Sequence, residues 1–220
     1  MTSSSNRDKV VSLSAGAGEV IVDFVGGKLD YRRKFGGGKN QALSKAVGLH
    51  KAQSELRIFD ATAGLGRDCF VLACLGAKIL ACERHPQVHA ALQDGLRRAL
   101  KADELKELLA DKISLINEDA IELLSCSASG LVSEFEPDVI YLDPMHPPQK
   151  KTALAKKDMR IFREIVGSDD DQIHLLKAAL SFPVNRVVVK RPAHAKPLIE
   201  GVSHAIKGKT TRFDVYMAQS

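Results

Sequence analysis

The sequence predicts an α/β fold built on a mostly parallel sheet with helices on both faces. Three observations lead to this prediction. From residue 56 onward, short runs of β-branched and aliphatic residues alternate with longer segments of helical spacing. Three of the short runs lead into an acidic residue, Asp60, Glu83 or Asp143, with a glycine or proline within the next four residues, as strands do before a turn. The chain has 220 residues, of which 45% are hydrophobic, so it can bury one sizeable core.

The first 50 residues predict a small extension rather than a unit of the sheet. Residues 1–20 lack the apolar core of a signal peptide, so we expect a flexible start in a cytoplasmic protein. Within residues 19–35, two β-rich runs flank Gly26-Gly27, which favours a hairpin with a two-residue turn. Residues 40–49 have helical spacing. We therefore expect an N-terminal extension over residues 1–50, packed on a core domain over residues 51–220.

The core domain should contain strands joined by right-handed helical crossovers. Gly76 is placed to end the first of its helices, and Pro86 is placed to open the second. No apolar run is long enough to span a bilayer. The predicted strands cover residues 56–61, 77–83, 112–117, 138–143, 185–191 and 212–218, and the predicted helices cover 67–76, 86–100 and much of 153–181.

The first of these strands ends in the stretch DATAGLGRD, residues 60–68. Gly64 and Gly66 would let the backbone approach a ligand closely, and the helix that follows offers free N–H groups. The third glycine of a dinucleotide motif is missing, and Asp60 stands four residues before Gly64. This arrangement suits a cofactor with a cationic amino-acid end, such as S-adenosylmethionine (SAM), better than it suits a pyrophosphate.

Acidic residues also follow the next two strands. Glu83 ends the second strand, where a carboxylate can accept hydrogen bonds from both ribose hydroxyls of an adenosine cofactor. Enzymes that bind NAD place an acid similarly, so Glu83 does not separate the two cofactors. Asp119 follows the third strand and is placed either to bind the exocyclic amine of an adenine or to cap a helix.

The fourth strand ends in Asp143-Pro144-Met145-His146-Pro147. This loop resembles the [D/N]-P-P-[Y/F] loop of methyltransferases that act on exocyclic amino groups of bases. The Asp143 carboxylate and the Pro144 carbonyl can accept hydrogen bonds from an aromatic amine and direct its lone pair toward a methyl donor. His146 takes the place of the usual aromatic residue, where it would stack on a flipped base.

Positive charge is concentrated in the C-terminal part of the chain. From Pro144 onward there are 14 Lys or Arg against 7 Asp or Glu, a net charge of +7, whereas residues 1–143 carry −2. Such a segment suggests a polyanionic partner, although a solvated basic surface would have the same composition. The residues selected as candidate phosphate contacts are Arg32, Arg33, Lys34, Lys150, Lys151, Lys190 and Arg191.

Taken together, seven motifs resemble the RsmJ-type methyltransferases, which modify the N2 amine of a guanine in small-subunit ribosomal RNA. The resemblance extends from about Glu19 to Tyr216. The motifs are IVDFVGG, YRRKFGGG, DATAGLGRD, YLDPMHP, ALAKKDMRIFREIVG, VVVKRP and RFDVY. The resemblance implies a Rossmann-like class I SAM-dependent methyltransferase that acts on 16S rRNA in the cytoplasm. Family cofactor contacts carry over to Arg67, Asp68, Glu83, Arg84, Asp119, Ala120 and Asp143.

Three other functions remain open at this point. A ribose 2′-O-methyltransferase uses a lysine–aspartate pair, which Lys190 and Asp143 would supply. An NAD-dependent oxidoreductase and a non-enzymatic RNA-binding protein are more remote alternatives. The four cysteines contain no C-x-x-C pair, so we expect free thiols and no metal site. We expect a monomer or a weak dimer.

Overall fold

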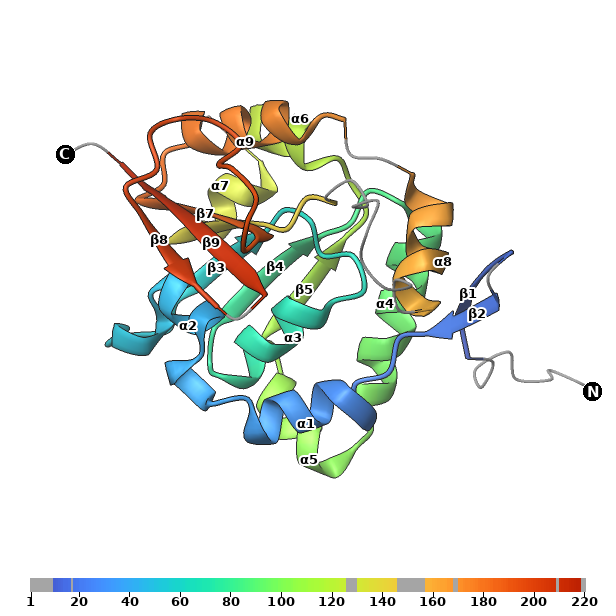
Figure 1. The fold of residues 1–220 in the computed structure, drawn as a ribbon. Helices are drawn as coiled ribbons and strands as arrows, with labels where there is room; N and C mark the ends of the chain where they lie inside the picture. Colours follow the sequence, from blue (N-terminus) through green and yellow to red (C-terminus); the bar gives the residue numbers. More distant parts are fainter. Residues whose placement is uncertain are drawn as a thin grey trace, which may run out of the picture.

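The computed structural model describes residues 10–16, 18–125, 130–145, 157–167, 170–208 and 210–218. Its main feature is a seven-stranded sheet with the strand order β5-β4-β3-β6-β7-β9-β8 (Figure 1). The five strands from β5 to β7 are parallel, whereas β9 pairs antiparallel with both β7 and β8. The strands are β3 (Arg57–Asp60), β4 (Lys78–Cys82), β5 (Ile113–Ile116), β6 (Val139–Leu142), β7 (Arg186–Pro192), β8 (His204–Lys207) and β9 (Thr211–Met217).

Helices cover both faces of the sheet because successive strand residues point to opposite sides. Ile58 and Ile79 join one apolar cluster, whereas their neighbours Phe59 and Leu80 join the other. The first cluster is covered by α3 (Arg67–Cys74), α4 (Pro86–Ala99) and α5 (Asp103–Leu109). The second is covered by α6 (Ala120–Ser125), α7 (Leu131–Phe135) and α9 (Gln172–Ser181). The mostly parallel sheet and the two helical layers confirm the predicted fold class.

The N-terminal elements lie against one side and one edge of this core. The hairpin of β1 (Ser12–Ala15) and β2 (Gly18–Ile21) contacts α8 (Lys157–Val166), as Figure 1 shows. Helix α1 (Gly27–Phe35) contacts α3, and α2 (Ala42–Val47) contacts β8 and β9. Two short 3₁₀ turns, η1 (Gly38–Asn40) and η2 (Leu49–Lys51), flank α2. The division at residue 50 stays a prediction.

Two predictions for the N-terminal region are wrong. The hairpin does not turn at Gly26-Gly27, because residues 27–35 form α1, in which Asp30 pairs with Arg33 and Lys34 one turn later. Such i,i+3 and i,i+4 pairs favour a helix over a strand. The start is not flexible over Ser12–Ala15, because this segment pairs with Gly18–Ile21 as β1. Residues 1–9 lie outside the described part of the chain.

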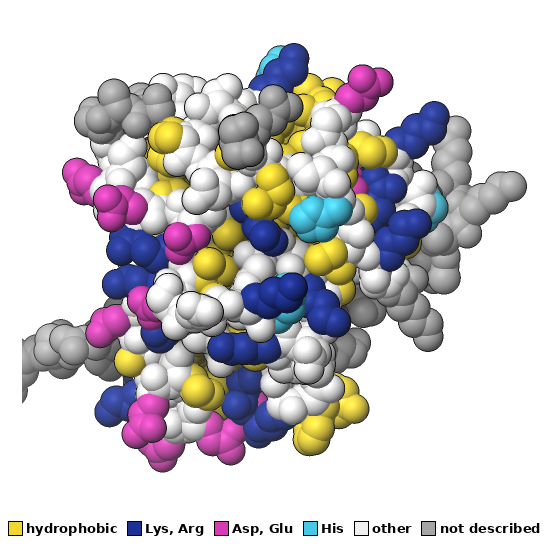
Figure 2. All heavy atoms as spheres, turned by 90° about the vertical axis from the view of Figure 1, so that its left-hand side faces the viewer, with side chains coloured by type: hydrophobic (Ala, Val, Ile, Leu, Met, Phe, Trp, Pro, Cys, Tyr) yellow, Lys and Arg dark blue, Asp and Glu magenta, His cyan; other side chains and the backbone are white. Residues whose placement is uncertain are grey.

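The predicted core strands and the main helices agree with the structure to within a few residues, but several short elements were not predicted. Strand β8 has four residues, three of them exposed, so it lacks the apolar alternation that marks a strand in sequence. It forms the edge of the sheet, and Lys, Arg and His side chains gather on the surface at this end of the molecule (Figure 2). None of the helices in the described residues is long and apolar enough to cross a bilayer.

Helix α4 approaches the chain after β2 so closely that Gly95 has no room for a side chain. A Cβ built on Gly95 would lie 2.8 Å from the carbonyl oxygen of Val22, which also accepts a hydrogen bond from Arg98. Gly95→Ala should therefore lower the free energy of unfolding by about 1–3 kcal/mol, because the clash outweighs the better helix propensity of alanine. Urea unfolding measures this. Gln93→Ala, at an exposed position of α4, should change stability by less than about 0.5 kcal/mol. An unchanged or higher stability of Gly95→Ala would contradict the close approach.

Candidate active site

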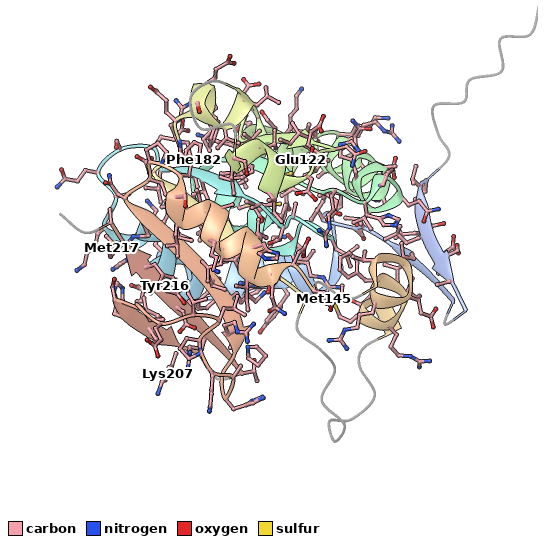
Figure 3. The ribbon with its side chains drawn as sticks, turned by 90° about the horizontal axis from the view of Figure 1, so that it is seen from above. Glu122, Met145, Phe182, Lys207, Tyr216 and Met217 are labelled. Atoms are coloured by element: carbon pink, nitrogen blue, oxygen red, sulfur yellow. The ribbon has the colours of Figure 1, made fainter. Side chains whose placement is uncertain are left out.

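A cavity of about 380 Å³ opens at the carboxyl ends of the parallel strands. It lies where the strand order reverses, since the chain runs from β3 outward to β5 and then returns to β6 on the other side of β3. Ligands of open α/β sheets bind at such a point. Residues of α8 and α9 complete the wall, and Met145 lies between these two helices (Figure 3).

The turn after β3 brings backbone and an acid to the cavity wall. Asp60 is 2% exposed, and its Oδ1 accepts a hydrogen bond from the backbone N–H of Thr62 at 3.1 Å. Gly64 has a φ of +53°, and a Cβ on it would lie 3.3 Å from Cζ of Phe162 in α8. Glycine is therefore required here for backbone conformation and for space.

Gly66 has a different role from Gly64, since it does not line the cavity. Its φ is +70°, and a Cβ on it would lie 2.4 Å from Cδ1 of Leu92 and 3.0 Å from Cζ of Phe24. The second glycine of the motif therefore allows α3 and α4 to pack closely behind the turn, whereas the first lies on the ligand side.

Glu83, at the end of β4, is 7% exposed and lines the cavity. Its Oε2 accepts a hydrogen bond from Gly64 N at 2.9 Å, and its Oε1 accepts one from His85 N at 2.7 Å. An ionised carboxylate has about four lone-pair positions, so a carboxylate at this place on the wall suits ligand hydroxyls. The fixed carboxylate thus joins the first two strand ends into one wall.

The next part of the wall follows β5. Asp119 Oδ1 accepts a hydrogen bond from Ile121 N at 2.8 Å, so this residue caps the start of α6 while its side chain lines the cavity. Ala120 lies beside it at the wall. Arg84 Nη1 binds Asp171 at the start of α9 and lies 3.7 Å from Asp119 Oδ2.

A cluster of charged side chains lies at the centre of the site. Lys190 Nζ, on β7, is 2.6 Å from Asp68 Oδ2 and 2.7 Å from Asp143 Oδ2. Asp68 Oδ2 also accepts a hydrogen bond from the hydroxyl of Tyr141 at 2.8 Å, and its Oδ1 accepts one from Arg32 Nη1 at 2.8 Å. The N–H of Asp143 donates to Thr62 Oγ1 at 2.6 Å, which fixes the start of the loop after β6. The cluster thus joins α1, α3, β6 and β7.

These contacts determine the protonation states in the cluster. Burial alone would raise the pKa of Asp68, but Lys190 and Arg32 hold that pKa well below its usual range. Burial likewise opposes the charge of Lys190, yet Asp143 and Asp68 raise the pKa of its ammonium group. For Asp143, burial raises the pKa, and the ion pair with Lys190 offsets only part of that effect.

Among the described residues, the cluster and its neighbour Asp60 contain three carboxyl groups and two cations, Lys190 and Arg32. Burial, together with the nearby charges of Asp68 and Asp143, raises the pKa of Asp60 to about 8. Asp60 and Asp143 both line the cavity. The cluster therefore lacks one permanent positive charge, which the proton on Asp60 supplies and which a cationic ligand in the cavity would supply in its place.

Helix α8 covers the cavity opposite the sheet. Arg67, the first residue of α3, binds the carboxylate of Asp158 and lies 3.5 Å from Sδ of Met159. Phe162, one turn further along α8, lies over Gly64. The cavity is thus enclosed between the turn after β3 and an amphipathic helix that also contacts β1 and β2.

The structure places the candidate phosphate contacts as follows. Arg32 binds Asp68, whereas Arg33 and Lys34 both bind Asp30 and Glu104. Lys190 is in the central cluster, and Arg191 is 7% exposed and donates to Gln172 Oε1 at 3.0 Å. Their contact with RNA stays a prediction, and each already has a partner within the protein. His146, Lys150 and Lys151 lie outside the described residues.

Three side chains of the site were not selected from the sequence: Thr62, Tyr141 and Phe162. The sequence could have indicated Tyr141, because a tyrosine in an otherwise aliphatic buried strand needs a partner for its hydroxyl. Phe162 belongs to the MRIF stretch of α8, with helical spacing from Met159. In the described residues, Cys69, Cys74 and Cys82 are free thiols, and no group of three His, Cys, Asp or Glu side chains is arranged to hold a metal ion.

Comparison with known proteins gives consistent matches along nearly the whole chain. A family model of SAM-dependent methyltransferases matches residues 5–218. Ribosomal RNA small subunit methyltransferase J of Vibrio vulnificus (strain YJ016) is 50% identical over 209 residues, which is 92% of this chain and 79% of that protein. Its namesake in Agrobacterium fabrum is 47% identical over 199 residues, or 90% and 91% of the two chains. A solved SAM-dependent methyltransferase from Neisseria gonorrhoeae is 40% identical with a TM-score of 0.69, covering 91% of this chain and 75% of that one.

Replacement of Lys190 tests the central cluster. Lys190→Met should lower the free energy of unfolding by on the order of 3 kcal/mol, because two carboxylates lose their shared cation. Adding Asp143→Asn to the same chain should recover part of this loss, since it removes the carboxylate that loses Lys190, whereas Asp68 keeps Arg32. Urea unfolding measures both variants, with Lys101→Met, an exposed position, as the control. Equal stability of Lys190→Met and the wild type would contradict the cluster.

Replacement of Asp60 tests the buried proton. The carboxyl of Asp60 has a pKa of about 8 in the fold and ionises near pH 4 when the chain is unfolded, so folding takes up a proton between these values. The stability of the wild type relative to Asp60→Asn should therefore fall as the pH rises from about 4.5 to 8, by on the order of 1 kcal/mol per pH unit. Above about pH 8 the difference should level off. Urea unfolding at half-unit pH intervals measures it, and a difference independent of pH would show that Asp60 is ionised throughout.

Proposed function

The chain belongs to the ribosomal RNA small subunit methyltransferase J family of SAM-dependent methyltransferases, and from this membership we propose that it methylates the N2 amine of a guanine in 16S rRNA. The substrate would be the RNA itself or the small ribosomal subunit, encountered in the cytoplasm. The related proteins of Vibrio vulnificus and Agrobacterium fabrum support the ribosomal substrate by their names and by their identity over most of the chain.

The missing positive charge of the cavity is the observation that best supports the proposal. SAM carries a sulfonium and an ammonium group, and when bound it supplies a methyl group on a sulfur that departs readily. Asp60 and Asp143 offer carboxyl groups to these cations at the cavity wall, where Lys190 and Arg32 leave one of three carboxyl groups without a cation. A pyrophosphate would bring more negative charge to the same carboxylates, which argues against a dinucleotide cofactor.

The remaining wall residues fit the other parts of the same cofactor. Glu83 would accept the ribose hydroxyls, because its carboxylate lines the cavity and is held in place by the backbone N–H groups of Gly64 and His85. Asp119 would accept the adenine amine beside Ala120. These assignments follow the order of strand ends along the sheet, from β3 to β4 to β5.

Asp143 and Pro144 would act on the base that receives the methyl group. Lys190 occupies only Oδ2 of Asp143, and in the described residues no donor binds Oδ1. Oδ1 and the Pro144 carbonyl would accept the two N–H groups of the amine, so that its lone pair faces the methyl group. Lys190 favours the ionised form of Asp143, which stabilises the positive charge that develops on nitrogen. The product loses a proton only after transfer, so no base is required before it.

The ion pair between Lys190 and Asp143 is also the feature expected of a ribose 2′-O-methyltransferase. That reaction needs a lysine that can accept a proton from a hydroxyl. Although burial alone would lower the pKa of Lys190, Asp143 and Asp68 raise it, so Lys190 stays an ammonium group, which has no lone pair to accept a proton. Methylation of the base is therefore the better-supported reaction.

Replacement of Asp143 tests the proposal. Asp143→Ala should reduce methyl transfer to 16S rRNA by at least about a hundredfold, because the amine loses its acceptor in the transition state. The measurement uses labelled SAM and 16S rRNA from cells that lack the enzyme, followed by digestion to nucleosides and mass analysis for N2-methylguanosine. Asp103→Ala, at an exposed position of α5, is the matched control and should retain full activity.

Two outcomes would contradict the proposal. Wild-type turnover in Asp143→Ala would remove Asp143 from the reaction. A methyl group found on ribose in the wild-type product would identify the reaction as 2′-O-methylation instead.

A further inference from the structure

The surface formed by α2, its flanking turns and the β8 edge of the sheet has no assigned role. It carries five exposed lysines from segments far apart in sequence. Those of the N-terminal region are Lys39, Lys45 and Lys51, and those of the C-terminal region are Lys196 and Lys207. We call these residues and the elements that bear them the basic face. None of the five lysines makes an ion pair with any of the residues that the structure describes.

Acidic residues are nearly absent from the segments that form the basic face. There is no Asp or Glu between residues 36 and 54, and Glu200 is the only one between residues 172 and 213. The cations near α1 differ, because Arg33 and Lys34 are bound by Asp30 and Glu104. Among the described residues, positive charge on the basic face therefore has few acidic neighbours. Figure 2 shows Lys and Arg side chains over the centre and right of this side, with Asp and Glu side chains mainly along its left and lower rims.

The fold holds these segments together rigidly. Helix α2 contacts β8 and β9, and a Cβ built on Gly208 would lie 3.9 Å from Cβ of Ala42. Arg186 at the start of β7 donates to the carbonyl oxygen of Ala46 at 2.8 Å, which fixes the other end of α2. Lys45, next to Ala46, and Lys207, at the end of β8 (Figure 3), therefore have fixed positions relative to each other.

The basic face continues to the mouth of the cavity. Thr210, Thr211 and Pro192 line the cavity, and Pro192 pairs with Thr211 between β7 and β9. The next rung of β9 pairs Arg212 with Lys207 of β8. A polyanion bound along the basic face would thus reach the cavity at the strand ends, where the target amine must enter.

We infer that the basic face is the surface on which the phosphate backbone of the RNA substrate docks. The inference rests on the proposed function and extends it by naming the docking surface. A row of unpaired lysines on a rigid frame suits phosphates, because it holds the strand in place without reading its sequence. The phosphate contacts would thus come from η1, α2, η2, β8 and the segment before β8, rather than from Arg32, Arg33 and Lys34.

The double variant Lys45→Glu/Lys207→Glu tests the inference. The KM for 16S rRNA, or for the small subunit if that is the form methylated, should rise at least tenfold at 150 mM KCl, while kcat changes less than twofold. The slope of log KM against log salt should decrease by about one to two, since each lost phosphate contact removes about 0.7–0.9. SAM affinity should not change.

The matched control is Lys101→Glu/Lys106→Glu, which makes the same change in net charge at exposed positions near α5. Its KM should stay within threefold of the wild type. An equal rise in KM for both double variants would show that total charge, not the basic face, determines binding, and would overturn the inference. Thermal melting shows whether Lys45→Glu/Lys207→Glu is folded. If it is unfolded, Lys45→Gln/Lys207→Gln takes its place and should raise the KM for rRNA at least threefold. An unchanged KM in that variant would overturn the inference.

The wild type separates this inference from the proposed function. If the wild type methylates 16S rRNA and Lys45→Glu/Lys207→Glu has the same KM, the docking surface is wrong and the function stands. If the wild type transfers no methyl group to rRNA, the proposed function is wrong, and equal rRNA affinities of the wild type and the variant in filter binding would overturn the docking surface too. Binding to phosphatidylglycerol vesicles that is lost in the variant, with unchanged rRNA affinity, would assign the face to a membrane and overturn the inference.

Discussion

The buried carboxylate of Asp68 is the constraint on which the site depends. A charge that is 7% exposed would be costly without partners, and the fold supplies three: Lys190 from β7, Arg32 from α1 and the hydroxyl of Tyr141 from β6. Each partner comes from a different element, so satisfying one carboxylate fixes three elements around α3. Lys190 also reaches Asp143, which ties the loop after β6 to the same point.

The same charges explain why the cavity favours a cationic ligand. Two cations, Lys190 and Arg32, lie beside three carboxyl groups that line the cavity. Asp68 is paired with both cations, whereas Asp60 and Asp143 are the carboxyl groups whose pKa values are raised. Outside the cavity the sign is reversed, because the lysines of the basic face have no acidic partners among the described residues. A cationic methyl donor would supply the positive charge that the cavity lacks, and the proposed polyanionic acceptor would meet positive charge outside it, so each substrate would be attracted to its own side.

Glycines set the distances in this arrangement. Gly64 leaves room for Phe162 of α8 above the cavity, whereas Gly66 and Gly95 allow α4 to approach the turn after β3 and the chain after β2. The N-terminal elements therefore contribute to the site in two ways. Arg32 reaches the central cluster directly, and the β1–β2 hairpin packs against the helix that covers the cavity.

The parallel core and the acids at its strand ends could be predicted from the sequence, because strand periodicity and turn chemistry are local properties. Asp60, Gly64, Glu83, Asp119 and Asp143 all lie at the cavity wall, since parallel strands end at one edge of the sheet. The partners of the charged residues could not be predicted in this way. Asp68 is 36 residues from Arg32 and 122 from Lys190, and no local pattern encodes such pairs. For the same reason the fold, and not the composition, distinguishes the basic residues bound by carboxylates from those that have no acidic partner among the described residues.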